Sequence, residues 1–215
     1  MSIKTAMGTT IFAAALMTGQ AWSLGSEKMS PAQTPQSFAT EFGNALPPIG
    51  YVRFCAENPA ECKPRDSDLQ RLAMDPERWS TLYQVNTYVN GKVAPVSDQD
   101  LYGEPEYWAY PTDAGDCEDY LLLKRRYLAG LGFPVDVLLI TVVLDEKKEG
   151  HAVLTVTTDQ GDYVLDNRRN EILRWSDLEY TFLKRQSASD PRAWVALVKD
   201  KPQATGFVSG GNVEK

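Results

Sequence analysis

The spacing of apolar positions divides the chain into a helical part followed by a strand-rich part. Between residues 66 and 90, apolar side chains recur three and four positions apart, which is the spacing of one face of an α-helix. Pro76 follows Asp75 and suits the first turn of a helix. We therefore predict a short helix and then a longer one in this segment.

A further helix is predicted over residues 117–131, where leucines share one face and glycines with a proline follow the last turn. Lys124, Arg125 and Arg126 are expected to face solvent on this helix. The preceding segment 91–115 is expected to be a loop, because prolines and glycines interrupt any regular pattern. Its aromatic side chains either line a cleft or pin the loop to the core, and they are Tyr102, Tyr107, Trp108 and Tyr110.

Runs rich in branched apolar residues predict strands in the second part of the chain. A buried strand is expected over 135–144, and the strands 151–158 and 162–166 follow, with a short turn between them. A strand or a short helix is expected after Ile172, and 194–198 has the pattern of a final strand. Helices followed by strands around one core are typical of an α+β domain.

Composition limits the number of domains and the kinds of partner. A chain of 215 residues suffices for one well-filled core but not for two large ones. Its 22 basic and 29 acidic residues give a formal net charge of −7. This charge disfavours nucleic acids and acidic membranes, so no nucleic acid is expected among the partners.

The first residues have the pattern of an export signal. Lys4 supplies a positive start, residues 11–17 an apolar core, and residues 21–23 (Ala-Trp-Ser) a cleavage site flanked by small side chains. We expect 1–23 to be a signal peptide, with an uncleaved membrane anchor as the alternative. The mature protein would then be periplasmic or secreted.

The rest of the chain is expected to form one domain with two flanking segments. Residues 24–43 are rich in Ser, Pro, Gln and Thr and are predicted to be a flexible tether. The folded domain is expected over 44–200, and residues 201–215 form a C-terminal tail. This arrangement places all of the candidate chemistry in the central segment.

Export also changes the meaning of the cysteines, because disulfides form in oxidising compartments. A turn-like insert with Asn58 and Pro59 separates Cys55 from Cys62 and lets their α-carbons approach. We expect these two to be bonded, which leaves Cys117 unpaired. An unpaired cysteine is a buried structural residue, an intermolecular partner or a reactive thiol.

Cys117, His151 and Asp166 are the candidate chemical groups. Cys117 lies where a helix begins, and the free NH groups and partial positive charge of a helix start favour a thiolate and can bind an oxyanion. His151 is the only histidine and thus the only imidazole base, and Asp166 is a candidate to orient it. Taken singly, the histidine also suits an exposed strand position and the aspartate a salt-bridged turn. Their occurrence together favours a catalytic site.

The predicted hairpin brings His151 and Asp166 to one face of the sheet. Two turn positions are compatible with the sequence, and they would pair His151 with either Arg168 or Asn170. In both registers the side chains of His151 and Asp166 point to the same face of the sheet. Asp166 lies two or four residues before the position directly opposite His151. A slip by one residue or a bulge would separate them.

Several short motifs occur in a fixed order over residues 44–198. They are Val85-Asn86, Val89-Asn90, Tyr107-Trp108, Gly115-Asp116-Cys117-Glu118-Asp119-Tyr120 with Lys124, Leu131-Gly132, His151-Ala152-Val153-Leu154 and Val164-Leu165-Asp166-Asn167. Together with the pair Cys55 and Cys62, they resemble the bacterial transglutaminase-like cysteine peptidases, a family related to the LapG-type periplasmic adhesin proteases. The resemblance implies a papain-like, transglutaminase-like fold, in which the cysteine-bearing helix packs against an antiparallel sheet with the histidine and the aspartate.

The same resemblance implies a calcium requirement. Its ligands in the family flank the nucleophile, which corresponds to Asp116 and Glu118 here, with Asp119 as a further candidate. Clustered carboxylates suit calcium because it prefers hard oxygen ligands. Acidic residues in a first helical turn are also favoured by the helix dipole alone, without any metal.

By this resemblance the chain would be an exported cysteine endopeptidase that cleaves a protein through a thioester acyl-enzyme. Cys117 would attack, His151 would transfer the proton, and Asp166 would orient the imidazole. A protein-glutamine transamidase would use the same residues, and a calcium-linked binding module would keep only the fold. The expected substrate is a surface or periplasmic protein, with a membrane protein as candidate regulator. The loop 109–114 is shorter than in adhesin-cleaving relatives, which leaves the substrate open.

Overall fold

The computed structural model describes residue 2 and the segments 37–64 and 71–199. The C-terminal tail and, apart from residue 2, the predicted signal peptide lie outside these residues. Part of the predicted tether is described, and it is bonded to the sheet. The backbone oxygen of Ser37 accepts from the Asp162 amide at 2.9 Å, and the Phe42 amide donates to the Ala196 oxygen at 2.8 Å.

The main element of the described residues is a seven-stranded sheet, in which every neighbouring pair is antiparallel. Its strands, in order across the sheet, are β1 (Asn44–Ala45), β9 (Trp194–Ala196), β8 (Thr181–Gln186), β4 (Leu138–Leu144), β5 (Gly150–Thr158), β6 (Gly161–Leu165) and β7 (Leu173–Arg174). A separate parallel pair joins β2 (Ala94–Pro95) to β3 (Ala114–Gly115).

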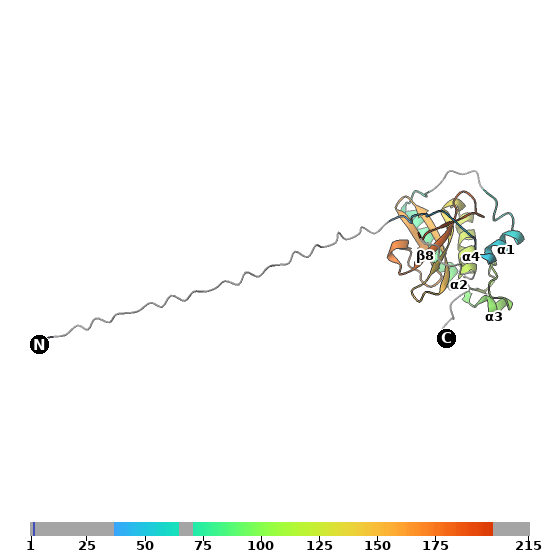
Figure 1. Cartoon of the computed structure of the whole chain (residues 1–215), viewed down its shortest axis with the longest axis horizontal. Coiled ribbons are helices and arrows are strands. Elements are labelled where there is room, and N and C mark those ends of the chain that lie inside the picture. The colour runs from blue at the N-terminus through green and yellow to red at the C-terminus, as the bar shows by residue number, and fades with distance from the viewer. Residues whose placement is uncertain (1, 3–36, 65–70, 200–215) are drawn as a thin grey trace. The chain divides into compact units, whose positions relative to one another are not determined.

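Four α-helices accompany the sheet within the described part of the chain, and in Figure 1 α1, α3 and α4 are seen to the right of β8. They are α1 (Ile49–Glu57), α2 (Pro76–Lys92), α3 (Asp98–Tyr102) and α4 (Cys117–Gly130), with the short 3-10 turns η1 (Val135–Val137) and η2 (Trp175–Asp177). Helix α4 packs against both α2 and β5. Asp75 caps α2 by accepting from the Arg78 amide at 2.8 Å, and Pro76 fills its first turn.

Apolar side chains form one core on each face of the sheet. The larger core lies between the sheet and the helices, and it includes Phe54, Leu82, Val89, Leu121, Leu128, Ile140, Leu154 and Leu165. The smaller core is built from Val143, Val153, Val164, Leu178, Tyr180 and Phe182. Neighbouring residues of β5 therefore face different cores, as expected for a strand that is covered on both sides.

The described fold is mixed helix and antiparallel sheet, which confirms the predicted α+β class. Cys55 and Cys62 are bonded as predicted, with α-carbons 5.6 Å apart. None of the helices among the described residues is long and apolar enough to cross a membrane.

The short helix expected between residue 66 and Pro76 lies partly outside the described residues, and over 71–75 the chain is not helical, with Leu72 bridging to Thr158. Two other local predictions were wrong. The predicted loop 91–115 contains the five-residue helix α3, which begins after its N-cap residue Ser97 and ends before Gly103. The other error concerns α4, where Lys124 and Arg125 are buried rather than exposed, whereas Arg126 is exposed as predicted. This helix packs against α2 and against β5, so most of its surface is covered.

Candidate functional site

Cys117 is the first residue of α4, and its relative exposure is only 4%. Asp116 is the N-cap residue and has an extended backbone, while the backbone amide of Ala152 donates a hydrogen bond to the sulfur. Because Ala152 follows His151 in β5, this contact joins the start of the helix to the strand that carries the imidazole.

His151 and Asp166 lie at one end of the β5–β6 hairpin. Thr158 pairs with Gly161, which corresponds to the first of the two predicted registers, with His151 in line with Arg168. Nε2 of His151 lies 3.0 Å from Oδ1 of Asp166, and both side chains are 1% exposed. With Nε2 bonded to the carboxylate, Nδ1 is the ring nitrogen that can exchange a proton with a thiol.

The carboxylate of Asp166 is held by several donors. Oδ1 also accepts from the Arg168 amide at 3.0 Å, and Oδ2 accepts from the Tyr180 hydroxyl at 2.7 Å. Burial raises the pKa of this carboxyl, but the hydrogen bond and charge of His151, the Arg168 amide and the Tyr180 hydroxyl together lower it below its ordinary value. An ionised Asp166 needs a donor, and so it places the imidazole proton on Nε2.

Two asparagines of α2 fix the backbone that carries Asp166. Nδ2 of Asn90 donates to the backbone oxygens of Asp166 and Arg169, each at 2.9 Å. Nδ2 of Asn86, one helical turn earlier, donates to the backbone oxygens of Arg169 and Asn170, each at 3.1 Å. The sequence motifs contain both asparagines, and the structure explains why amide side chains are needed there.

Three carboxylates form a compact acidic cluster beside the thiol. Asp98, Asp116 and Glu118 are buried, and each offers an oxygen within 4.8 Å of the others. Among the described residues, Oδ1 of Asp98, Oδ1 of Asp116 and Oε1 of Glu118 have no hydrogen-bond partner. Burial raises the pKa of all three carboxyls, to about 7 for Asp98, and the negative charges of neighbouring carboxylates further raise the pKa of Asp98 and Glu118.

The cluster fits a calcium ion. Calcium takes hard oxygen ligands, whereas zinc and copper sites are built mainly from histidine and cysteine. A buried carboxylate oxygen without a partner is costly unless a cation or a proton compensates it. Asp116 and Glu118 are the ligands that the resemblance implies, and Asp98 is a third candidate that the sequence did not reveal. Asp98 comes from α3, within the segment predicted to be a loop.

Asp119 is placed differently from the other acidic residues. Its Oδ1 accepts from the Ala109 amide at 2.8 Å, so it holds the loop before Cys117 and does not join the acidic cluster. Burial raises its pKa to about 8. A Cβ at position 115 would lie 2.4 Å from Oδ2 of Asp119, which explains why this position is a glycine.

The thiol is less acidic than its position at a helix start predicts. Burial raises the pKa of Cys117 well above its ordinary value, and the negative charges of Glu118 and Asp116 raise it further. The thiol donates to Oε2 of Glu118 at 3.1 Å. The favourable effect of the helix terminus is therefore outweighed, and ionisation of the thiol requires a base such as His151.

Lys124 is a buried cation of α4 with a relative exposure of 1%. Burial lowers its pKa to about 7, although the charge of Asp166 opposes the shift. Between about pH 7 and pH 10 the unfolded chain therefore binds a proton at this amine that the folded chain does not. The free energy of unfolding should rise with pH across that window, by up to about 1.4 kcal/mol per pH unit from this group.

Replacing Lys124 with methionine should remove this contribution, because methionine fills similar volume without titrating. Urea unfolding at several pH values between 7 and 10 should give a smaller slope for Lys124→Met than for the wild type. The exposed Lys92 at the end of α2 provides a matched control as Lys92→Met. Equal slopes for wild type and Lys124→Met would contradict the prediction.

Comparison with known proteins adds an independent observation. A family described as "Bacterial transglutaminase-like cysteine proteinase BTLCP" matches residues 41–202. No curated protein matches the chain. Among solved structures, the chain is similar to EGTA-treated Legionella pneumophila LapG, with 26% identity, coverage of 55% of this chain and 67% of that chain, and a TM-score of 0.47. It is also similar to calcium-bound Legionella pneumophila LapG, with 24% identity, coverage of 63% of this chain and 78% of that chain, and a TM-score of 0.48.

Proposed function

Because the chain belongs to the family of bacterial transglutaminase-like cysteine proteinases, we propose that it is an exported cysteine endopeptidase with Cys117 as its nucleophile. The proposal depends on one observation: His151 is bonded to Asp166, and the amide of Ala152, the residue after His151, donates to the sulfur of Cys117. Protein is the substrate class that fits such a peptidase. Periplasmic or secreted location is part of the proposal and rests on the signal pattern of residues 1–23.

The proposed reaction begins with the transfer of the Cys117 proton to Nδ1 of His151. The thiolate then attacks the carbonyl carbon of the scissile peptide bond, and backbone NH groups at the start of α4 donate to the oxygen that becomes negative. His151 returns the proton to the leaving amine as the C–N bond breaks and a thioester forms. Asp166 stabilises the imidazolium through the hydrogen bond to Nε2.

The second half of the reaction releases the acyl group. His151 removes a proton from a water molecule, and the oxygen of that water attacks the thioester carbonyl. The C–S bond then breaks and the sulfur takes up the proton, which restores the thiol and frees a carboxylic acid. A transamidase would differ only here, since an amine would replace the water.

We also propose that Asp98, Asp116 and Glu118 hold a calcium ion. When bound, the ion would supply positive charge next to two carboxylates that otherwise raise the pKa of the thiol. The unpartnered oxygens of the three side chains support this assignment.

Incubation of wild-type protein and Cys117→Ala with a periplasmic and surface proteome tests the proposed function. New peptide ends that appear only with the wild type, and at a shared sequence context, are the expected result in the presence of calcium. A parallel reaction with an excess of a primary amine separates the two reaction types by mass. Products that carry the amine would indicate transamidation, and identical peptide ends with both proteins would contradict peptidase activity.

A further inference from the structure

Tyr180 contacts both members of the pair His151 and Asp166. It precedes β8 directly and is 9% exposed. Its hydroxyl lies 2.7 Å from Oδ2 of Asp166, while His151 occupies the other oxygen at 3.0 Å. Its ring stands nearly perpendicular to the imidazole, with centroids 5.8 Å apart. The sequence motifs do not include this residue.

The direction of the Tyr180 hydrogen bond follows from its second partner. Nη2 of Arg169 donates to the phenolic oxygen at 3.2 Å, and the guanidinium has no acceptor capacity. The single hydroxyl proton is therefore left to point at Asp166. Burial, and then the charge of Asp166, raise the pKa of Tyr180 above its ordinary value, so the hydroxyl keeps this proton near neutral pH.

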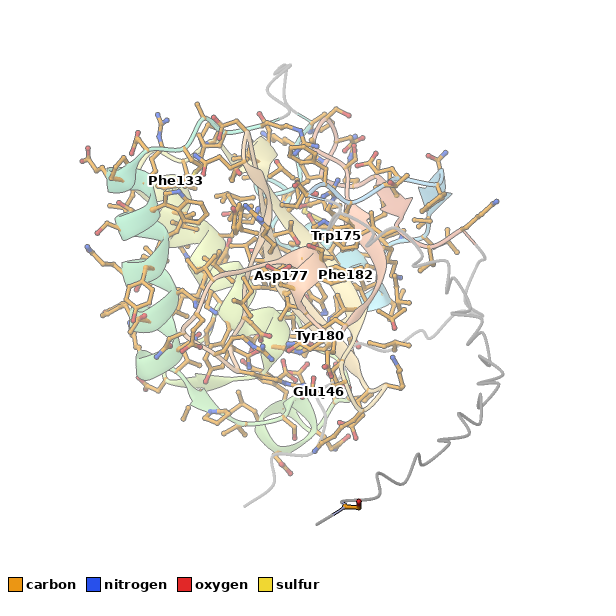
Figure 2. All side chains as sticks on the ribbon, turned by 90° about the vertical axis from the view of Figure 1, so that its left-hand side faces the viewer. Phe133, Glu146, Trp175, Asp177, Tyr180 and Phe182 are labelled. Carbon is orange, nitrogen blue, oxygen red and sulfur yellow. A yellow bond between two sulfur atoms is a disulfide. The ribbon has the colours of Figure 1, made fainter. Side chains whose placement is uncertain are left out.

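The aromatic neighbours of Tyr180 limit its movement. Phe182 lies 6.4 Å from its ring centroid, and Trp175 packs edge-on against Phe182 at 5.5 Å. Figure 2 shows Trp175, Phe182 and Tyr180 following one another along one face of the molecule. The phenol is thus part of the smaller core, which also contains Val153 and Val164 of the hairpin that bears His151 and Asp166.

We propose that Tyr180 is a positioning residue that fixes the orientation of the Asp166 carboxylate and, through it, the tautomer of His151. This role rests on the proposed function of the same site. With Oδ2 bonded to the phenol, the carboxylate plane cannot rotate away, and Oδ1 stays directed at Nε2. The proton then remains on Nε2, and Nδ1 stays available as the base towards Cys117.

Tyr180→Phe is the variant that tests the role, because it removes the hydroxyl and keeps the ring. Tyr163→Phe is the matched control, since the Tyr163 hydroxyl also accepts from an arginine, Arg174 at 3.1 Å, elsewhere in the sheet. For Tyr180→Phe we expect kcat on a cleavable peptide to fall about tenfold, the loss expected for one hydrogen bond to a charged group. KM should stay within about twofold of the wild type, and Tyr163→Phe should retain wild-type kcat.

A second readout does not need an active peptidase. Because the chain has a single histidine, nitrogen-labelled, untagged Cys117→Ala protein gives the Nδ1 and Nε2 signals of one imidazole in NMR. At a pH where the ring is neutral, we expect the proton on Nε2 in this protein. Adding Tyr180→Phe should give a mixture with the Nδ1 tautomer, whereas adding Tyr163→Phe should leave the signal unchanged.

The two readouts separate failure of this role from failure of the proposed function. An inactive wild type with a tautomer shift in Tyr180→Phe would overturn the peptidase and keep the positioning role. An unchanged tautomer, or a kcat equal to that of Tyr163→Phe, would overturn the positioning role. A thermal unfolding midpoint that falls far more in Tyr180→Phe than in Tyr163→Phe would also overturn it in favour of a purely structural one.

Discussion

Replacing His151 with glutamine is expected to lower kcat/KM by about a thousandfold or more. Loss of a general base alone costs about 10²–10⁴, and loss of a residue that acts in a unit with the nucleophile costs more. A loss in the upper part of this range is expected because burial and the negative charges of Glu118 and Asp116 raise the pKa of the Cys117 thiol. Without an imidazole, the thiol stays protonated, and the chain contains no second histidine.

The double variant His151→Gln with Cys117→Ala provides the control. Residues that act as one catalytic unit have strongly non-additive effects, so the double variant should be no slower than the slower single one. Steady-state kinetics on one peptide substrate measure all three variants, and circular dichroism checks that each is folded. Additive losses would mean that the two side chains do not act in one step.

Much of the fold follows from local patterns. The turn between β5 and β6 is two residues long, and this length sets the register of the hairpin. Because side chains alternate between the two faces of a strand, this register brings His151 and Asp166 to the same face, where they are bonded. Strand β8 was not predicted, because its sequence Thr-Phe-Leu-Lys-Arg-Gln has neither a continuous apolar run nor a strict alternation. Its buried Arg185 pairs with Asp162 at 2.9 Å, a partner that only the folded sheet brings near.

The candidate site likewise contains residues that the sequence reveals and residues that only the folded structure reveals. Cys117, His151 and Asp166 are recognisable because their residue types, a helix start and a hairpin define chemistry from nearby positions in the sequence. Asp98 and Tyr180 are not, because α3 and the start of β8 reach the site only through tertiary packing. The burial of Lys124 was likewise missed, since a charged helix residue is normally assigned to solvent until its neighbours are known.

Calcium should raise the thermal unfolding midpoint of the wild type, and Asp98→Asn should abolish this effect. An ion at one hundred times its Kd stabilises the native state by about 2.7 kcal/mol, which corresponds to a shift of roughly 5–10 °C for a chain of this size. Asparagine keeps the volume and the acceptor for the Tyr107 amide but removes one of three clustered charges. Without calcium, Asp98→Asn should therefore be at least as stable as the wild type, because repulsion among the buried carboxylates is reduced.

Asp100→Asn is the matched control, since Asp100 lies two residues later in α3 but is exposed and bonded to Ser97. Scanning fluorimetry with calcium or with EGTA should show the wild-type shift in Asp100→Asn and none in Asp98→Asn. Calorimetric titration with calcium should give one site per chain for wild type and Asp100→Asn. A calcium shift that survives in Asp98→Asn would assign the ion to other ligands, and no shift in the wild type would remove calcium from the proposed mechanism. The opposite signs expected for Asp98→Asn with and without the ion distinguish lost coordination from general damage to the fold, which would lower the midpoint in both conditions.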